Sequence, residues 1–142
     1  MSAFRSYLRV VSSTLDPDDI SDRLASPPDE ATARGSRKRP ELPPRTTTTW
    51  TRNVTAPVED ARPEDFEPVI LAWGPEFARA LGSLVTAGDA FVALELVQEI
   101  RDLDSSREKG IFLSPELLAW LATSHASLDI DQYIFHDCSE DL

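Results

Sequence analysis

The sequence predicts an α+β protein of the ferredoxin-like or double βαβ type, with about five strands in an antiparallel sheet and helices packed mainly on one face. Segments that alternate between apolar and polar residues, typical of strands, are interleaved with segments of three-and-four spacing, typical of helices. Two predicted strands precede similar helix starts, Asp-Pro-Asp at 16–18 and Ser-Pro-Glu at 114–116. This order, in two similar halves, indicates the architecture. We expect residues 1–142 to form a single domain, because the chain is long enough for one core.

Residues 4–11 alternate in polarity and predict the first strand. One face is apolar and the other is largely basic and aromatic. The apolar face carries Phe4, Leu8 and Val10, and the opposite face carries Arg5, Tyr7, Arg9 and Val11.

A short helix is predicted directly after this strand. Asp16 can cap the free amides and Pro17 suits the first helical position. Ile20 and Leu24, four residues apart, give the helix an apolar face. The prolines that begin at Pro27 end it, because the residue before a proline avoids the helical region.

Residues 27–45 are rich in proline and arginine and predict a flexible loop. The loop contains the basic run 34–39, and almost none of its side chains suits a core. Residues 46–54 then predict a second strand, since β-branched threonines favour this conformation. One face of that strand carries Trp50, Arg52 and Val54.

The segment from 66 to 84 has the period of an amphipathic helix. Its apolar positions are Phe66, Val69, Ile70, Trp73, Phe77, Leu81 and Leu84. Gly74 and Pro75 interrupt the run and predict a kink or two consecutive helices, and Gly88 ends it.

Two further strands, a helix and a last strand complete the predicted order. The strands cover 91–100 and, briefly, 111–113. Pro115 begins the last helix, whose buried side is Leu117, Leu118 and Leu121. The last strand covers 128–135, and we expect residues 136–142 to be frayed.

The charge of the chain is strongly asymmetric. Residues 1–52 carry nine Lys or Arg against seven Asp or Glu, whereas residues 53–142 carry five against 18. The net charge of −11 argues against nucleic-acid binding over the whole surface, because phosphates would be repelled. No stretch is long and apolar enough for a membrane span, and no signal peptide is recognisable. A single cysteine rules out a disulfide framework, so we expect a cytoplasmic protein.

Several short blocks together resemble a known family. They are Leu-Asp-Pro-Asp-Asp-Ile at 15–20 with Leu24 and Pro27, Gly35, Trp50 in a strand, Leu-Ser-Pro-Glu-Leu-Leu at 113–118 with Leu121, and Leu-Asp-Ile-Asp-Gln-Tyr at 128–133. In this combination, from Phe4 to Tyr133, the sequence resembles the bacterial "domain of unknown function 4279" family. It departs from the pattern at Ala25-Ser26, where a Leu-Gly turn is expected. The resemblance implies a small bacterial α+β protein and no particular activity.

The Asp129-Ile130-Asp131 segment is the first candidate site. Two aspartates at a strand end can hold magnesium or act in phosphoryl transfer, but the further partners of such sites are missing. Simple alternation, with Leu128 and Ile130 inward and both aspartates outward, explains the pattern as well. If this strand neighbours the first one, Arg5, Tyr7 and Arg9 would meet Asp129, Asp131 and Tyr133 in cross-strand pairs. Incomplete pairing would leave an aromatic and arginine surface for a partner.

Three other groups of residues are candidate sites. Arg37, Lys38 and Arg39 could bind nucleic acid or an acidic surface, or could form a solvated insertion or an intramolecular tether. Trp120 would be an interface anchor if it were exposed. His136, Asp137 and Cys138, with His125 upstream, lack the fixed geometry that a nucleophile needs.

We therefore expect no catalytic, cofactor-binding or metal-binding residues, and no cofactor. The leading hypothesis is a non-enzymatic protein-binding module of the immunity or adaptor type. Its acidic second half, around 59–67 and 95–104, would face a basic partner. The alternative is binding of RNA or single-stranded nucleic acid by the basic loop and the face with Arg5, Tyr7 and Arg9.

Overall fold

A computed structural model of the chain describes residues 3–135, which contain four helices and five strands. In chain order these are β1 (Phe4–Ser12), α1 (Pro17–Leu24), β2 (Glu30–Thr32), β3 (Thr48–Val54), α2 (Pro63–Ala72), α3 (Pro75–Thr86), β4 (Phe91–Ile100), α4 (Pro115–Ser124) and β5 (Ser127–Ile134). The architecture is α+β, as the sequence predicts.

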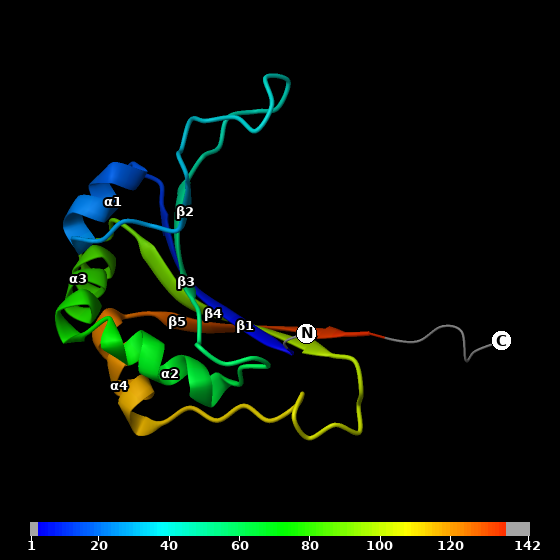
Figure 1. The fold of residues 1–142 in the computed structure, drawn as a ribbon. Coiled ribbons are helices and arrows are strands. Elements are labelled where there is room, and N and C mark those ends of the chain that lie inside the picture. The colour runs from blue at the N-terminus through cyan, green and yellow to red at the C-terminus, as the bar shows by residue number, and fades with distance from the viewer. Residues whose placement is uncertain (1–2, 136–142) are drawn as a thin grey trace.

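The strands form one sheet in the order β2-β3-β1-β4-β5. β1 lies at the centre and is antiparallel to both β3 and β4, with Leu8 opposite Arg52 on one side and Leu94 on the other. β4 and β5 are parallel, because α4 carries the chain back between them. The sheet is therefore mixed rather than wholly antiparallel. Its strands twist strongly, so that β3 and β5 run in clearly different directions (Figure 1).

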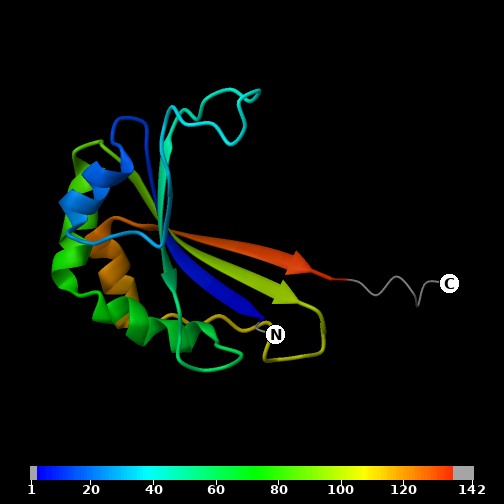
Figure 2. The same ribbon diagram turned by 45° about the horizontal axis from the view of Figure 1, so that its top comes forward.

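All four helices lie on one side of the sheet (Figures 1 and 2). The core fills the space between them and the inward side chains of β1, β3 and β4. Its fully buried members include Leu8, Ile20, Trp50, Leu81 and Leu84. The other face of the sheet has no helix against it (Figures 1 and 2), although its side chains on β4, such as Ala93, Glu95 and Val97, are buried.

Each of the four helices begins with a proline. The missing proline N–H has no partner in a first turn, so it costs nothing there. At the start of α1 the Asp19 carboxylate accepts the Asp16 N–H at 2.9 Å, so the cap hydrogen bond comes from the Asp19 side chain rather than from that of Asp16. Gly74 separates α2 from α3 and has a φ of 90°, a conformation that favours glycine. The interrupted run therefore becomes two consecutive helices.

The structure corrects further sequence predictions, among them the buried position of Leu118, which is 52% exposed. Residues 111–113 form no strand, because none of the described strands lies alongside them. The supposedly irregular residues 30–32 form β2, which pairs with β3. Leu128 and Ile130 do lie on the helix side of β5, but they are not buried, since β5 is an edge strand. The frayed tail predicted at 136–142 lies outside the described residues.

Candidate functional site

The uncovered side of the sheet, which we call the open face, brings together most of the candidate residues. Alternation along each strand sets every second side chain on it. The open face comprises Arg5, Tyr7, Arg9, Thr49, Thr51, Asn53, Ala93, Glu95, Val97, Asp129, Asp131 and Tyr133. It is basic on β1 and acidic on β5, so opposite charges lie side by side on one surface.

The basic half of the open face contains a shallow groove of about 470 Å³. It is lined by Arg5, Tyr7, Arg9, Glu30, Thr49, Thr51 and Asn53. Arg5 is exposed, and within the described part of the chain it forms no ion pair. One guanidinium in this groove is therefore available to a ligand.

Arg9, in contrast, is engaged by Glu95 on the neighbouring strand. The Arg9 Nε and Nη2 atoms lie 3.0 and 2.8 Å from Glu95 Oε1. The Glu95 side chain is only 3% exposed, whereas that of Arg9 is 37% exposed. A buried carboxylate needs such a partner, because burial strips its water. The pair fixes the centre of the open face.

The surroundings of Glu95 favour its neutral form. Burial raises the pKa of its carboxyl group, and the hydrogen bond and charge of Asp129 raise it further, whereas Arg9 opposes the shift. The pKa of the neighbouring Tyr7 is also raised, mainly by burial and then by the charge of Glu95. Burial is the main cause of both pKa shifts, and the carboxylates near these two groups add to them.

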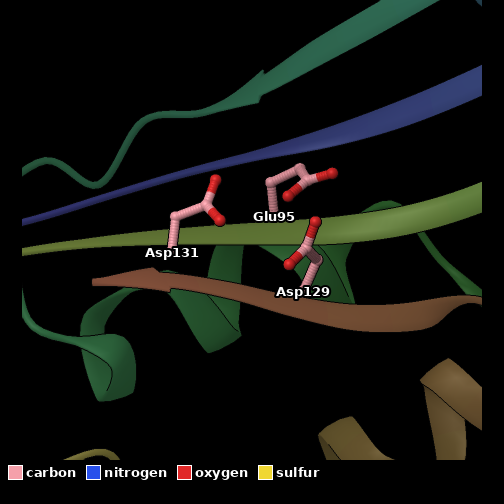
Figure 3. Close-up of side chains that lie close together, drawn as sticks. All are labelled: Glu95, Asp129 and Asp131. Atoms are coloured by element: carbon pink, nitrogen blue, oxygen red, sulfur yellow. The ribbon is translucent and has the colours of Figure 1, made fainter. Parts of the chain in front are cut away.

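Glu95, Asp129 and Asp131 form an acidic cluster in which ligand oxygens lie within 4.8 Å of one another. Figure 3 shows the three side chains standing on the same side of β4 and β5. Carboxylates at this spacing attract cations, either a hard metal ion or the Lys and Arg side chains of a partner. Asp129 and Asp131 are exposed, so the cluster is open to solvent.

The predicted cross-strand pairs between β1 and β5 do not form. β4 lies between the two strands, and the partner of Arg9 is Glu95. From the sequence, Glu95 is considered only as part of the acidic segment 95–104, and its pairing with Arg9 is not predicted. The available signal was a single charge within the apolar run of β4 before Gln98, since a buried charge requires a partner.

The residues between β2 and β3, here called the basic arm (33–47), project from the end of these strands on the side away from the helices (Figures 1 and 2). Backbone hydrogen bonds join Gly35 to Arg45 and Arg45 to Ser36 at its base. The Arg37 guanidinium binds the Leu42 carbonyl at 2.9 Å, and Arg39 lies 3.3 Å from Glu41. Lys38 is exposed. The arm is thus exposed and separate from the groove.

Trp120 is not exposed, so the condition under which it would be an interface anchor is not met. Its side chain is 6% exposed and packs against Trp73 and Phe77, with ring centroids 6.0 and 6.4 Å away. Its indole N–H donates to the Gly74 carbonyl at 3.1 Å. Trp120 belongs to the core because α4 turns it toward the junction of α2 and α3.

β5 is the most accessible element of the site. All eight of its residues are exposed, among them Leu128, Ile130, Tyr133 and Ile134. Among the described residues no strand pairs with its outer edge. Tyr133 lies at the end of the open face, next to Glu99, which binds Arg101 at 2.8 Å. Apolar surface, acids and unpaired backbone therefore coincide on this strand.

Comparison with known proteins gives one match. The family model described as "Domain of unknown function (DUF4279)" matches residues 2–135. No curated protein and no solved structure matches the chain. In the described part of the chain, none of the helices has the length and apolar character needed to cross a bilayer.

Proposed function

The chain belongs to the family of the domain of unknown function DUF4279, and from its surface we propose that it is a non-enzymatic protein-binding module with a basic protein as partner. It acts in the bacterial cytoplasm, in an immunity-type or adaptor role. The family description names no activity, and the support for this function comes from the side chains of the open face and β5.

The observation that carries the proposal is the exposure of β5. Large hydrophobic side chains on an exposed edge strand are unusual in a protein that works alone, because such edges invite pairing with other chains. On the same strand, Asp129 and Asp131 extend the acidic cluster at Glu95. An apolar surface flanked by carboxylates suits a partner that offers both hydrophobic and basic side chains.

The charge distribution supports a basic partner as well. Residues 53–142, which include β4 and β5, carry a net charge of −13. Negative potential of this size steers a positively charged protein toward the surface and speeds association. A basic toxin held by its inhibitor is one pairing with this chemistry.

Affinity purification with matched variants tests the proposal. The tagged wild-type chain should retain one basic protein in a 1:1 ratio, and the complex should form again from purified components. Asp129→Asn with Asp131→Asn should weaken retention. Glu76→Gln with Glu116→Gln, which makes the same charge change on exposed helix positions, should not. A variable mixture of proteins, retained equally by all three chains, would contradict the proposal.

The free guanidinium of Arg5, in a groove with Tyr7, favours a second candidate function. Single-stranded RNA could stack on Tyr7 and pair its phosphates with Arg5 and the basic arm. The acidic cluster on adjacent strands opposes this, because it repels phosphates. Fluorescence anisotropy at low salt distinguishes the two candidates. RNA binding that falls when Arg37, Lys38 and Arg39 are neutralised would support this alternative, and no binding would exclude it.

A further inference from the structure

Within residues 3–135, the outer edge of β5 has no neighbouring strand, and its outward backbone groups follow a defined order. The Phe135 N–H donates to the Ile100 carbonyl at 2.9 Å, toward β4. Backbone groups alternate in direction along a strand, so the N–H and C=O of Leu128, Ile130, Gln132 and Ile134 point the other way. These groups form a template for one more strand.

The two faces of this edge differ in chemistry. On the helix side, Leu128, Ile130 and Ile134 are 37%, 39% and 52% exposed, and their counterparts on β4 are buried. The helices cover β4 and leave the margin of β5 uncovered. On the open face, Asp129 and Asp131 line the same edge beside Glu95. A strand added here would meet apolar side chains on one side and carboxylates on the other.

We propose that β5 binds its partner by strand addition, and that the added strand alternates Lys or Arg with apolar residues. The basic residues would face Asp129 and Asp131, and the apolar ones would extend the row formed by Leu128, Ile130 and Ile134. Main-chain hydrogen bonds supply affinity in this mode and the alternating side chains supply specificity. The inference rests on the proposed function, which it deepens by naming the recognised segment.

Charge complementarity favours this occupant over a second copy of the chain. In a two-fold pair of β5 strands, registers centred on Ile130 or Asp131 set aspartate directly opposite aspartate, and like charges in that position are destabilising. In other registers the net charge of −11 on each copy still opposes association. A basic strand meets neither obstacle, so the aspartates favour it over a second copy.

A peptide as long as β5, in which Lys alternates with Val and Ile, serves as the probe. Its binding to the full chain is followed by fluorescence anisotropy at low salt. Three control peptides carry the lysines in one block, replace Lys with Glu, or have N-methyl groups along one edge. We expect the alternating peptide to bind, and each control to bind at least about tenfold more weakly, because each removes charge pairing, alternation or backbone hydrogen bonds.

Two readouts locate the peptide on β5. Hydrogen exchange of the Ile130 and Gln132 amides should slow in the complex, whereas that of Asp131 and Tyr133 should already be slow in the free protein. Asp129→Asn with Asp131→Asn should weaken binding by about 3- to 30-fold. The control pair Glu76→Gln and Glu116→Gln should leave binding unchanged.

Several outcomes overturn the inference. They are equal binding of the N-methylated peptide, unchanged exchange at Ile130 and Gln132, and a dimer of the chain alone that dissociates in Ile130→Lys. If a basic partner still binds in a 1:1 ratio while those amides remain unprotected, the proposed function stands and strand addition is wrong. If no protein partner is retained at all, both are wrong.

Discussion

At the scale of single residues, Glu95 organises the site. It lies in the middle of β4, almost completely buried, and is held between the Arg9 guanidinium and the Asp129 carboxyl group. Replacing a buried ion pair by apolar residues is often neutral or stabilising, so such a group is weak evidence of a role in stability. Its position between the basic and acidic halves of the open face is more consistent with a role in binding.

The raised pKa of Glu95 predicts a specific pH dependence of stability. A carboxyl group whose pKa is higher in the folded state stabilises the fold below its ordinary value of 4.5 and loses that contribution as pH rises through the raised pKa. The unfolding free energy of the wild type, relative to Glu95→Gln, should therefore fall as the pH rises from below 4.5 through the raised pKa of Glu95. Urea denaturation at intervals of pH measures this difference.

Glu116→Gln is the matched control for that experiment. It removes one carboxylate from an exposed position on α4 and keeps the fold intact. If the unfolding free energy of the wild type minus that of Glu95→Gln stays constant or rises with pH, the environment of Glu95 does not favour its neutral form.

Trp120 gives the second prediction at this scale. Trp120→Phe removes the indole N–H that binds the Gly74 carbonyl, which then keeps only the Ala78 N–H at 3.3 Å. The loss of one hydrogen bond should lower the unfolding free energy by about 0.5–1.5 kcal/mol, measured by thermal or urea denaturation. Partner binding by the folded variant should be unchanged, since the side chain is buried on the helix side. A selective loss of binding would restore Trp120 as an interface residue.

At the scale of elements, the pattern of the sequence was sufficient where it reflects local physics. Proline and acid at the helix starts, alternation in β1 and β4, and the break at Gly74 and Pro75 all depend on neighbours in the chain. Strand order depends on distant contacts, so the position of β4 between β1 and β5 was not predictable, nor was the Arg9–Glu95 pair. The buried place of Trp120 was missed for the same reason, because it depends on the junction of α2 and α3.

The contact between α3 and α4 depends on a glycine. A Cβ atom on Gly82 would lie 2.5 Å from the Thr123 carbonyl oxygen, closer than such atoms approach. Gly82→Ala should force the two helices apart and lower the unfolding free energy by about 1–3 kcal/mol. Ser83→Ala, at the next and exposed position of the same helix, is the control and should change stability little. Equal stability of the Gly82→Ala chain would contradict the close packing observed here.

At the scale of the whole molecule, the two sides of the sheet have different roles. The helix side holds the core, and the open face with β5 presents charge, apolar surface and free backbone. The sequence predicted the charge asymmetry and the basic and acidic residues of this face. It did not predict which strand lies at the edge, because that depends on the pairing of β4 with β5. The composition therefore indicates the charge of the binding surface, and the fold is needed to locate it on β5.

The salt dependence of a purified 1:1 complex tests the central claim most directly. Isothermal titration of the chain with its basic partner should give a dissociation constant that rises steeply with salt, because opposite charges meet at the interface. The rise should be shallower for Asp129→Asn with Asp131→Asn and unchanged for Glu76→Gln with Glu116→Gln. A 1:1 complex whose affinity is insensitive to salt and to Asp129 and Asp131 would contradict the account.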